Sequence, residues 1–202
     1  NDTATKARYC PLLQAISEHQ QALSAEVLEQ WQAKDGMAAE LKTFPNARYA
    51  EAPEAVAELL RAQVSGLDGL KKKLGTPLGR QSKGVPQPYQ AEAWRSQASL
   101  AMLAASLATA ERMWHGAEQN GVQRLLSDDQ GALRQRIDEA FADTRQRLAA
   151  LPRPLGELVA DEEGRAQLNA LYDSLNTLHR LHEAELANAM GIQLGFNAHD
   201  GD

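Results

Sequence analysis

Apolar residues recur every three or four positions along most of this chain, the spacing that places side chains on one face of an α-helix. No segment alternates apolar and polar residues convincingly enough to predict a β-strand. The periodicity predicts helices over about Thr3–Lys34, Pro53–Leu74, Ala91–Gly116, Gln130–Leu151 and Asp161–Met190. Because short connections favour antiparallel neighbours, we expect an all-α fold: an up-and-down bundle of four to five long helices, forming a single domain over residues 1–202.

Four of the five predicted helices, all but Ala91–Gly116, have an apolar stripe that we expect to face inward. These stripes comprise Leu13, Ile16, Leu23, Val27 and Trp31; Val56, Leu59, Leu60, Val64, Leu67 and Leu70; Leu133, Ile137, Phe141 and Leu148; and Leu168, Leu171, Leu175 and Leu178. Gly66 and Gly69 interrupt the second helix, which indicates either close approach of another helix or tolerance of a weak helix. The third helix is rich in alanine and serine, and residues 96–110 carry no charge, so we place it at the bundle centre.

Two segments outside the predicted helices have a distinctive composition. The stretch from Gly75 to Tyr89 is rich in glycine and proline and predicts one long loop, either functional or disordered. Gly191 is a natural residue to end the last helix. The following tail carries Leu194 and Phe196, which favour burial, beside oxygen-bearing side chains at Asn197, Asp200 and Asp202. We expect a structured tail that docks on the bundle; the alternative is an anchored but inert end.

Composition narrows the classes of function. The net charge of -6, from 21 basic and 27 acidic residues, argues against nucleic acid as the main partner. The charge-free segment 96–110 is too short and too polar to span a membrane and predicts a buried helix. Cys10 is the single cysteine, so it is either a free buried thiol or half of a bridge to a segment absent here. The chain starts at Asn1 inside a helical pattern, which suggests a preceding segment, and a lost leader would be invisible.

Two histidine groups could in principle bind a metal. His179, His182, Glu183 and Glu185 lie three or four residues apart on the last helix, a spacing that bundle metal sites use. However, His182 continues the leucine stripe, and His179 with Glu183 matches an ordinary surface pair. His115 and Glu118 flank the predicted end of the third helix, so their side chains need not share a face, and His115 could equally cap that helix. We assign no metal ligand and no catalytic residue in this chain.

A third candidate is Trp94-Arg95-Ser96, with Ser99 three residues further along the same predicted face. An arginine beside a charge-free helix favours a carboxylate partner. We expect Asp200 or Asp202 of the tail to reach Arg95, with Phe196 in an apolar gap and Asn197 near Ser99. No serine has a histidine and an acid nearby in the pattern, so the sequence gives no sign of a hydrolase triad.

Several segments resemble the imelysin family. The tail from Leu194 to Asp202 is similar to that family's C-terminal signature, and residues 8–16 are similar to the start of its second half. Residues 171–186 match its last helix in pattern. Segments 74–79, 86–88, 92–96 and 99–100 fit the family in the same order. The resemblance covers essentially the whole chain.

The resemblance implies an exported bacterial protein, periplasmic or anchored to the outer membrane as a lipoprotein, often encoded near iron-uptake functions. It implies two helical bundles with a site between them, so the partners would be a preceding helical domain and other iron-uptake components. The family motif Gly-x-His-x-x-Glu is absent here, because Met113 and Arg180 stand where glycine would precede His115 and His182. The ligand-binding residues carried over are Arg95, Ser96, Ser99, Gly195, Phe196, Asn197, Asp200 and Asp202.

Two functions follow from the sequence and the resemblance, and a purely structural role for the bundle is a third interpretation. The first is a binding or scaffold role in iron or metal uptake, in which the oxygens of the tail suit iron or another divalent or trivalent cation. The second is part of a metallopeptidase whose metal ligands lie in the preceding half.

Overall fold

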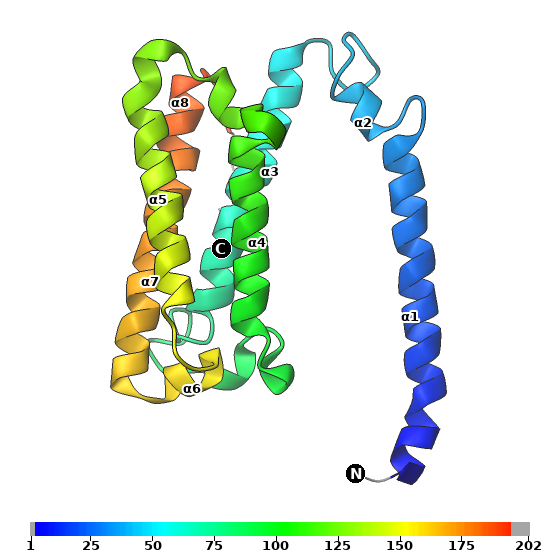
Figure 1. Ribbon diagram of the computed structural model, residues 1–202, viewed down its shortest axis with the longest axis vertical. Coiled ribbons are helices and arrows are strands. Elements are labelled where there is room, and N and C mark those ends of the chain that lie inside the picture. The colour runs from blue at the N-terminus through cyan, green and yellow to red at the C-terminus, as the bar shows by residue number, and fades with distance from the viewer. Residues whose placement is uncertain (1–2, 195–202) are drawn as a thin grey trace. The chain divides into compact units, whose positions relative to one another are not determined.

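The computed structural model describes residues 3–194 and divides the chain into two compact units, Asn1–Val56 and Ala57–Asp202. Figure 1 shows an all-α protein, and the part of the chain that the structure describes contains no strand. The predicted fold class is therefore confirmed. That both units fold as a single domain over residues 1–202 stays a prediction.

Unit 1 consists mainly of the long helix α1 (Thr3–Gln32), the short helix α2 (Met37–Glu40) and a folded loop. The turn between the helices requires glycine at position 36, because a Cβ there would lie 2.2 Å from the carbonyl oxygen of Gln30. The Asn46 side chain orders the loop: it donates to the carbonyl oxygen of Glu40 at 2.7 Å and accepts from the backbone amide of Tyr49 at 2.8 Å.

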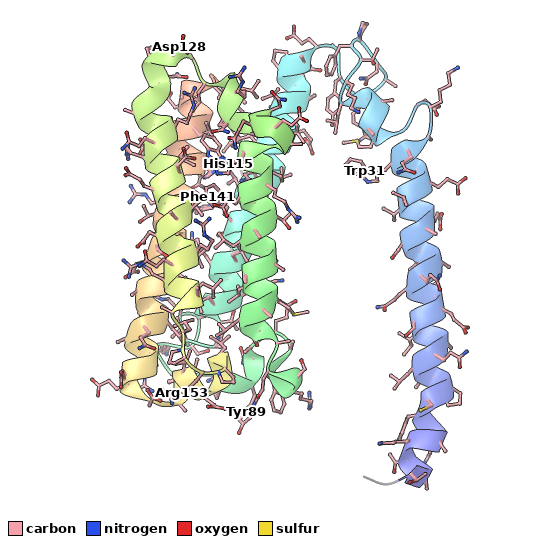
Figure 2. All side chains as sticks on the ribbon, viewed as in Figure 1. Trp31, Tyr89, His115, Asp128, Phe141 and Arg153 are labelled. Carbon is pink, nitrogen blue, oxygen red and sulfur yellow. The ribbon has the colours of Figure 1, made fainter. Side chains whose placement is uncertain are left out.

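The apolar stripe of α1 has a different environment from the one expected. No residue of α1 is buried, and Leu13 retains 61% of its surface. Trp31, labelled in Figure 2, is 46% exposed. The periodicity predicted the helix correctly, but within unit 1 its apolar face is not buried.

Unit 2 is a bundle of α3 (Ala52–Gly75, of which residues 57–75 belong to this unit), α4 (Ser99–His115), α5 (Gly131–Ala149) and α7 (Glu162–Arg180). These long helices run side by side, and α6 (Leu155–Ala160) crosses one end of them (Figure 1). Burial of a large apolar side chain contributes about 1.5–3 kcal/mol. The largest fully buried side chains are Trp114, Phe141, Leu60, Leu67, Leu74, Ile137, Leu155, Leu158, Leu168, Leu171, Leu178 and Leu186.

Helix α4 departs from the prediction in two ways. It begins at Ser99, not at Ala91, because Ala93 and Gln97 both adopt left-handed backbone conformations that a helix cannot contain. It also lies at the bundle surface and not at its centre: Met102 is 43% exposed, and residues 101, 104, 105 and 108 are exposed as well. Its small, uncharged residues therefore do not indicate burial on every side.

The glycines of α3 do not mark a close helix contact in unit 2. A Cβ built on Gly66 or Gly69 meets no atom within 4 Å. Both line an open groove between α3 and α4 that ends near Met113. Of the two interpretations that the sequence left open, tolerance of a weaker helix agrees with this geometry.

The predicted helix Asp161–Met190 corresponds to α7 together with two shorter helical segments that follow it. Asp161 caps its first turn by accepting from the backbone amide of Gly164 at 2.7 Å. The helix continues into a π turn, η6 (Leu181–Leu186), and then α8 (Ala187–Ala189). Gly191 follows with a φ of 66°, and Ile192 and Leu194 pack against the core. The predicted site residues Gly195, Phe196, Asn197, Asp200 and Asp202 lie outside the described residues.

Candidate functional site

The segment that precedes α4 has an unusual backbone. A short 3-10 turn, η2 (Trp94–Ser96), is flanked by Ala93 with a φ of 54° and Gln97 with a φ of 58°. Left-handed conformations cost an L-residue roughly 1–2 kcal/mol each, and they concentrate at functional sites. Two of them within five residues hold Trp94 and Arg95 at the surface.

Aromatic rings and a guanidinium group gather on this turn. The Tyr89 ring, on η1 (Pro88–Gln90), meets the Trp94 ring edge to face with centroids 5.0 Å apart. The Arg95 guanidinium lies over the Trp94 ring, 4.4 Å from its centroid. Tyr89 is 73% exposed and Trp94 36% exposed, so both rings remain accessible. The ion pairs among the described residues do not include Arg95.

These side chains form one wall of a pocket of about 310 Å³ at the end of unit 2 where Tyr89 and Arg153 are labelled in Figure 2. Gln97 and Ser99 extend the same wall. The start of α6, including Pro154 and Glu157, forms the opposite wall. The pocket thus combines stacking surfaces with one cationic and one anionic group. It suits an extended segment or a small molecule that carries both an apolar body and an anionic end.

The two predicted serines do not share a face with each other. Ser96 is exposed, and its hydroxyl donates to the carbonyl oxygen of Ala93 at 3.1 Å. Ser99 is buried, and its hydroxyl donates to the carbonyl oxygen of Glu92. Both hydroxyls stabilise the turn that carries Arg95. Their role is to shape the site, while Trp94, Tyr89 and Arg95 present its accessible chemistry.

His179 differs from the predicted surface pair because it is buried, at 5% exposure. Its Nδ1 atom lies 3.3 Å from Lys71 Nζ and 3.6 Å from a Glu183 carboxylate oxygen. Its Nε2 atom is buried and has no hydrogen-bond partner among the described residues. Burial, and then the positive charge of Lys71, lower the pKa of His179.

His182 is a core histidine, as predicted. Its ring lies between Trp114 and Phe141, with edge-to-face contacts at 5.8 Å and 5.6 Å, and Nδ1 lies 2.9 Å from the carbonyl oxygen of Leu178. Burial lowers its pKa to about 4, although the hydrogen bond to Leu178 acts in the opposite direction. At neutral pH the ring is therefore uncharged, and Nδ1 donates to that carbonyl.

The four charged or titratable groups of the last helix do not converge. Glu185 forms an ion pair with Arg136 at 2.6 Å, away from the two histidines. The described residues contain no group of three or more histidine, cysteine, aspartate or glutamate side chains placed to hold a metal ion.

The side chains of His115 and Glu118 also lie apart from one another. Trp114 donates its indole N–H to Asp138 at 2.6 Å, and His115 Nε2 lies 3.9 Å from the same carboxylate. Glu118 follows the end of α4 with a φ of 53°, so it does not share a helical face with His115. The buried Nδ1 atom of His115 caps no carbonyl among the described residues, so the predicted capping role is not found.

Comparison with known proteins gives one match. The family model described as Imelysin (Peptidase_M75) matches residues 1–182. No curated protein and no solved structure matches the chain. In the described residues, no helix is long and apolar enough to cross a membrane.

Proposed function

The chain belongs to the imelysin family, and we propose that it acts as a binding or scaffold module of an exported bacterial protein, and not as a self-sufficient peptidase. The observation that carries this proposal is the strained turn that holds Trp94 and Arg95 at the surface beside Tyr89. A guanidinium stacked on an aromatic ring, with no carboxylate of residues 3–194 paired to it, is a ready donor for an anionic group.

The anionic group that we assign to Arg95 is a carboxylate of the tail. Asp200 or Asp202 would meet the guanidinium, and Phe196 would enter the pocket between Trp94 and α6. Gly195 would give the tail its turn, and Asn197 would lie near Ser99. Supporting this arrangement, Ile192 and Leu194, the apolar residues just before the tail, pack against the core of unit 2.

A role in iron or metal uptake is the physiological part of the proposal, and it rests on the family. The described residues of the pocket do not fit a metal, since they offer one carboxylate, Glu157, opposite a guanidinium. A cation would have to be held by the tail oxygens together with a second helical domain of the same polypeptide. We propose that domain, and other iron-uptake components, as partners in the periplasm or at the outer membrane.

In the alternative function, this chain forms part of a metallopeptidase. The description of the matching family as a peptidase family favours it. In that case the metal ligands and the general base would lie in a preceding domain, because neither His115 nor His182 follows the family motif. The purified 202-residue chain should hydrolyse no peptide bonds. Metal-dependent proteolysis by this chain that is lost in His182→Ala would contradict this expectation and would place the metal site on the last helix of this chain instead.

Hydrogen exchange on the full chain tests the binding proposal. Amides of residues 195–202 should be protected in the parent protein and lose that protection in Arg95→Ala. Arg153→Ala is the matched control, because Arg153 pairs with Asp161 at the same end of the bundle and should leave the tail unchanged. Tail amides that exchange at the unprotected rate in the parent protein would contradict the proposal.

A further inference from the structure

Lys71 is turned into the bundle of unit 2, between α3 and α7. Its neighbour Lys72 is exposed and forms an ion pair with Asp68 at 2.9 Å. In contrast, the side chain of Lys71 is only 14% exposed, and its Nζ atom lies 3.3 Å from Nδ1 of the buried His179. This contact joins two helices inside one compact unit, so it does not depend on the position of unit 1.

The contact with Lys71 fixes the protonation state of His179. An ammonium group has donors only, so Nδ1 of His179 must accept from Lys71 and cannot carry a proton. The neutral ring then carries its proton on Nε2, which is buried. A protonated ring would turn an Nδ1–H group toward the ammonium, and the contact would become a repulsion between like charges. Only the neutral ring is therefore compatible with the position of Lys71.

Glu183 offers the same nitrogen an alternative partner. One of its carboxylate oxygens lies 3.6 Å from His179 Nδ1, one turn further along the helix. A protonated ring would donate to that carboxylate in a charge-assisted hydrogen bond, which is stronger than a neutral one. Glu183 belongs to η6, and π turns are rare and occur frequently at functional sites. Nδ1 thus lies between a donor that suits the neutral ring and an acceptor that suits the charged one.

The surroundings of His179 place its change of charge in acidic solution. Burial and then the charge of Lys71 lower its pKa below the ordinary value of 6.5, while the carboxylate of Glu183 acts in the opposite direction. The ring is therefore neutral at neutral pH and takes up a proton below pH 6.5. The charged or titratable groups around it come from three elements: Asp68, Lys71 and Lys72 of α3, His182 and Glu183 of η6, and Arg136 of α5, which pairs with Glu185.

We propose that Lys71, His179 and Glu183 form a proton-operated contact between α3 and α7. In the neutral state, His179 accepts from Lys71 and ties the last turns of α3 to α7. When a proton from solvent binds Nδ1, His179 donates to Glu183, and Lys71 turns to Asp68, whose carboxylate lies 3.6 Å from its Nζ atom. Acidification thus exchanges a contact between two helices for contacts within each of them. This inference is independent of the pocket around Arg95 and does not rest on the proposed function.

Nitrogen NMR of the imidazole rings in the full chain tests the neutral state without any substitution. At neutral pH, His179 should show the tautomer with its proton on Nε2. His182 is the internal reference and should show the opposite tautomer, because its Nδ1 atom lies 2.9 Å from the carbonyl oxygen of Leu178. On acidification, Nδ1 of His179 should become protonated, and the εCH₂ signals of Lys71 should shift with the same midpoint.

Three results of this titration would overturn the proposal. The first is a His179 ring that carries its proton on Nδ1 at neutral pH. The second is a set of Lys71 signals that do not follow the titration of His179. The third is a His179 ring that stays neutral until the chain unfolds.

Substitution of the two partners tests the direction of each effect. Lys71→Met keeps the length of the side chain but removes its charge, and it should raise the midpoint of the His179 titration by about 1 pH unit. Glu183→Gln should lower that midpoint. Lys72→Met is the matched control and should shift it less than Lys71→Met, because Lys72 is exposed and pairs with Asp68. Equal midpoints in the parent protein, Lys71→Met and Glu183→Gln would contradict the proposal, since burial alone would then set the charge of the ring.

Discussion

Helices α1 and α7 both carry an apolar stripe in their sequences, but the two stripes have different environments in the structure. On α7, Leu168, Leu171, Leu175 and Leu178 are at most 3% exposed, whereas the stripe of α1 remains about half exposed. The flanking residues differ as well. Helix α7 has Asp161 as its cap, acidic residues in its first turn and basic residues in its last turn, whereas the first turn of α1 has no acidic residue and its last turn no basic residue. Periodicity therefore predicts a helix and its apolar face, but it does not by itself predict that this face is buried.

The largest expected effect comes from deleting buried rings or leucines in unit 2. Phe141→Ala should lower the free energy of unfolding by about 3–5 kcal/mol, because it leaves a cavity beside His182. Leu13→Ala on α1, measured by urea unfolding in the same way, should change it by less than about 0.5 kcal/mol, because Leu13 is 61% exposed. Similar losses of unfolding free energy in the two variants would show that the apolar faces of α1 and α7 do not differ in burial.

A pH titration sharpens the comparison further, because α7 leads directly into the buried His182. The folded chain holds the pKa of His182 at about 4, below its ordinary value of 6.5. Between those values the unfolded chain binds a proton that the folded chain does not. The free energy of unfolding should therefore fall as pH falls, by about 1.4 kcal/mol per pH unit and about 3 kcal/mol in total from this residue.

The control for this titration is His182→Gln, which removes the titrating group. Its free energy of unfolding should depend less steeply on pH between 6.5 and 4, measured by urea unfolding at each pH. The pKa of His179 is lowered as well, so some of the slope should remain. Equal slopes in the two proteins would show that His182 is not the buried neutral ring described above.

Replacing glycine by alanine tests whether a helix surface is open or packed, and the expected effects on stability are smaller. Gly66→Ala should raise the free energy of unfolding by about 0.5–1 kcal/mol, because the new methyl group meets open space and alanine favours the helix. Gly164→Ala should lower it, because a Cβ there would lie 2.2 Å from the carbonyl oxygen of Leu158. Thermal unfolding of the two variants provides the measurement, and destabilisation by Gly66→Ala would mean that the groove between α3 and α4 is filled.

The sequence predicted the all-α fold, the long helices and the core leucines of α7, because these depend on local periodicity. It could not predict the start of α4, since Ala93 and Gln97 give no composition signal for left-handed conformations. Nor could it predict the burial of His179, which depends on Lys71, a residue 108 positions away.

The candidate site was predictable only in part. The sequence indicated Arg95 as a cation that favours a carboxylate partner, but its stacking on Trp94 and the approach of Tyr89 depend on two separate turns. Pro154 and Glu157, on the far wall of the pocket, come from a different part of the sequence. No periodic pattern connects these segments, so only the folded structure brings them together.

The central claim is that Trp94 and Arg95 are held at the surface for contact and not for stability. The most direct test is to measure, on the full chain, both the free energy of unfolding and the tail protection of Trp94→Ala and Arg95→Ala. We predict that each variant stays within about 1 kcal/mol of the parent protein, because both side chains lie at the surface, while protection of residues 195–202 is lost. A loss of more than about 3 kcal/mol with the tail protection unchanged would contradict the claim and make the pair a structural part of the bundle.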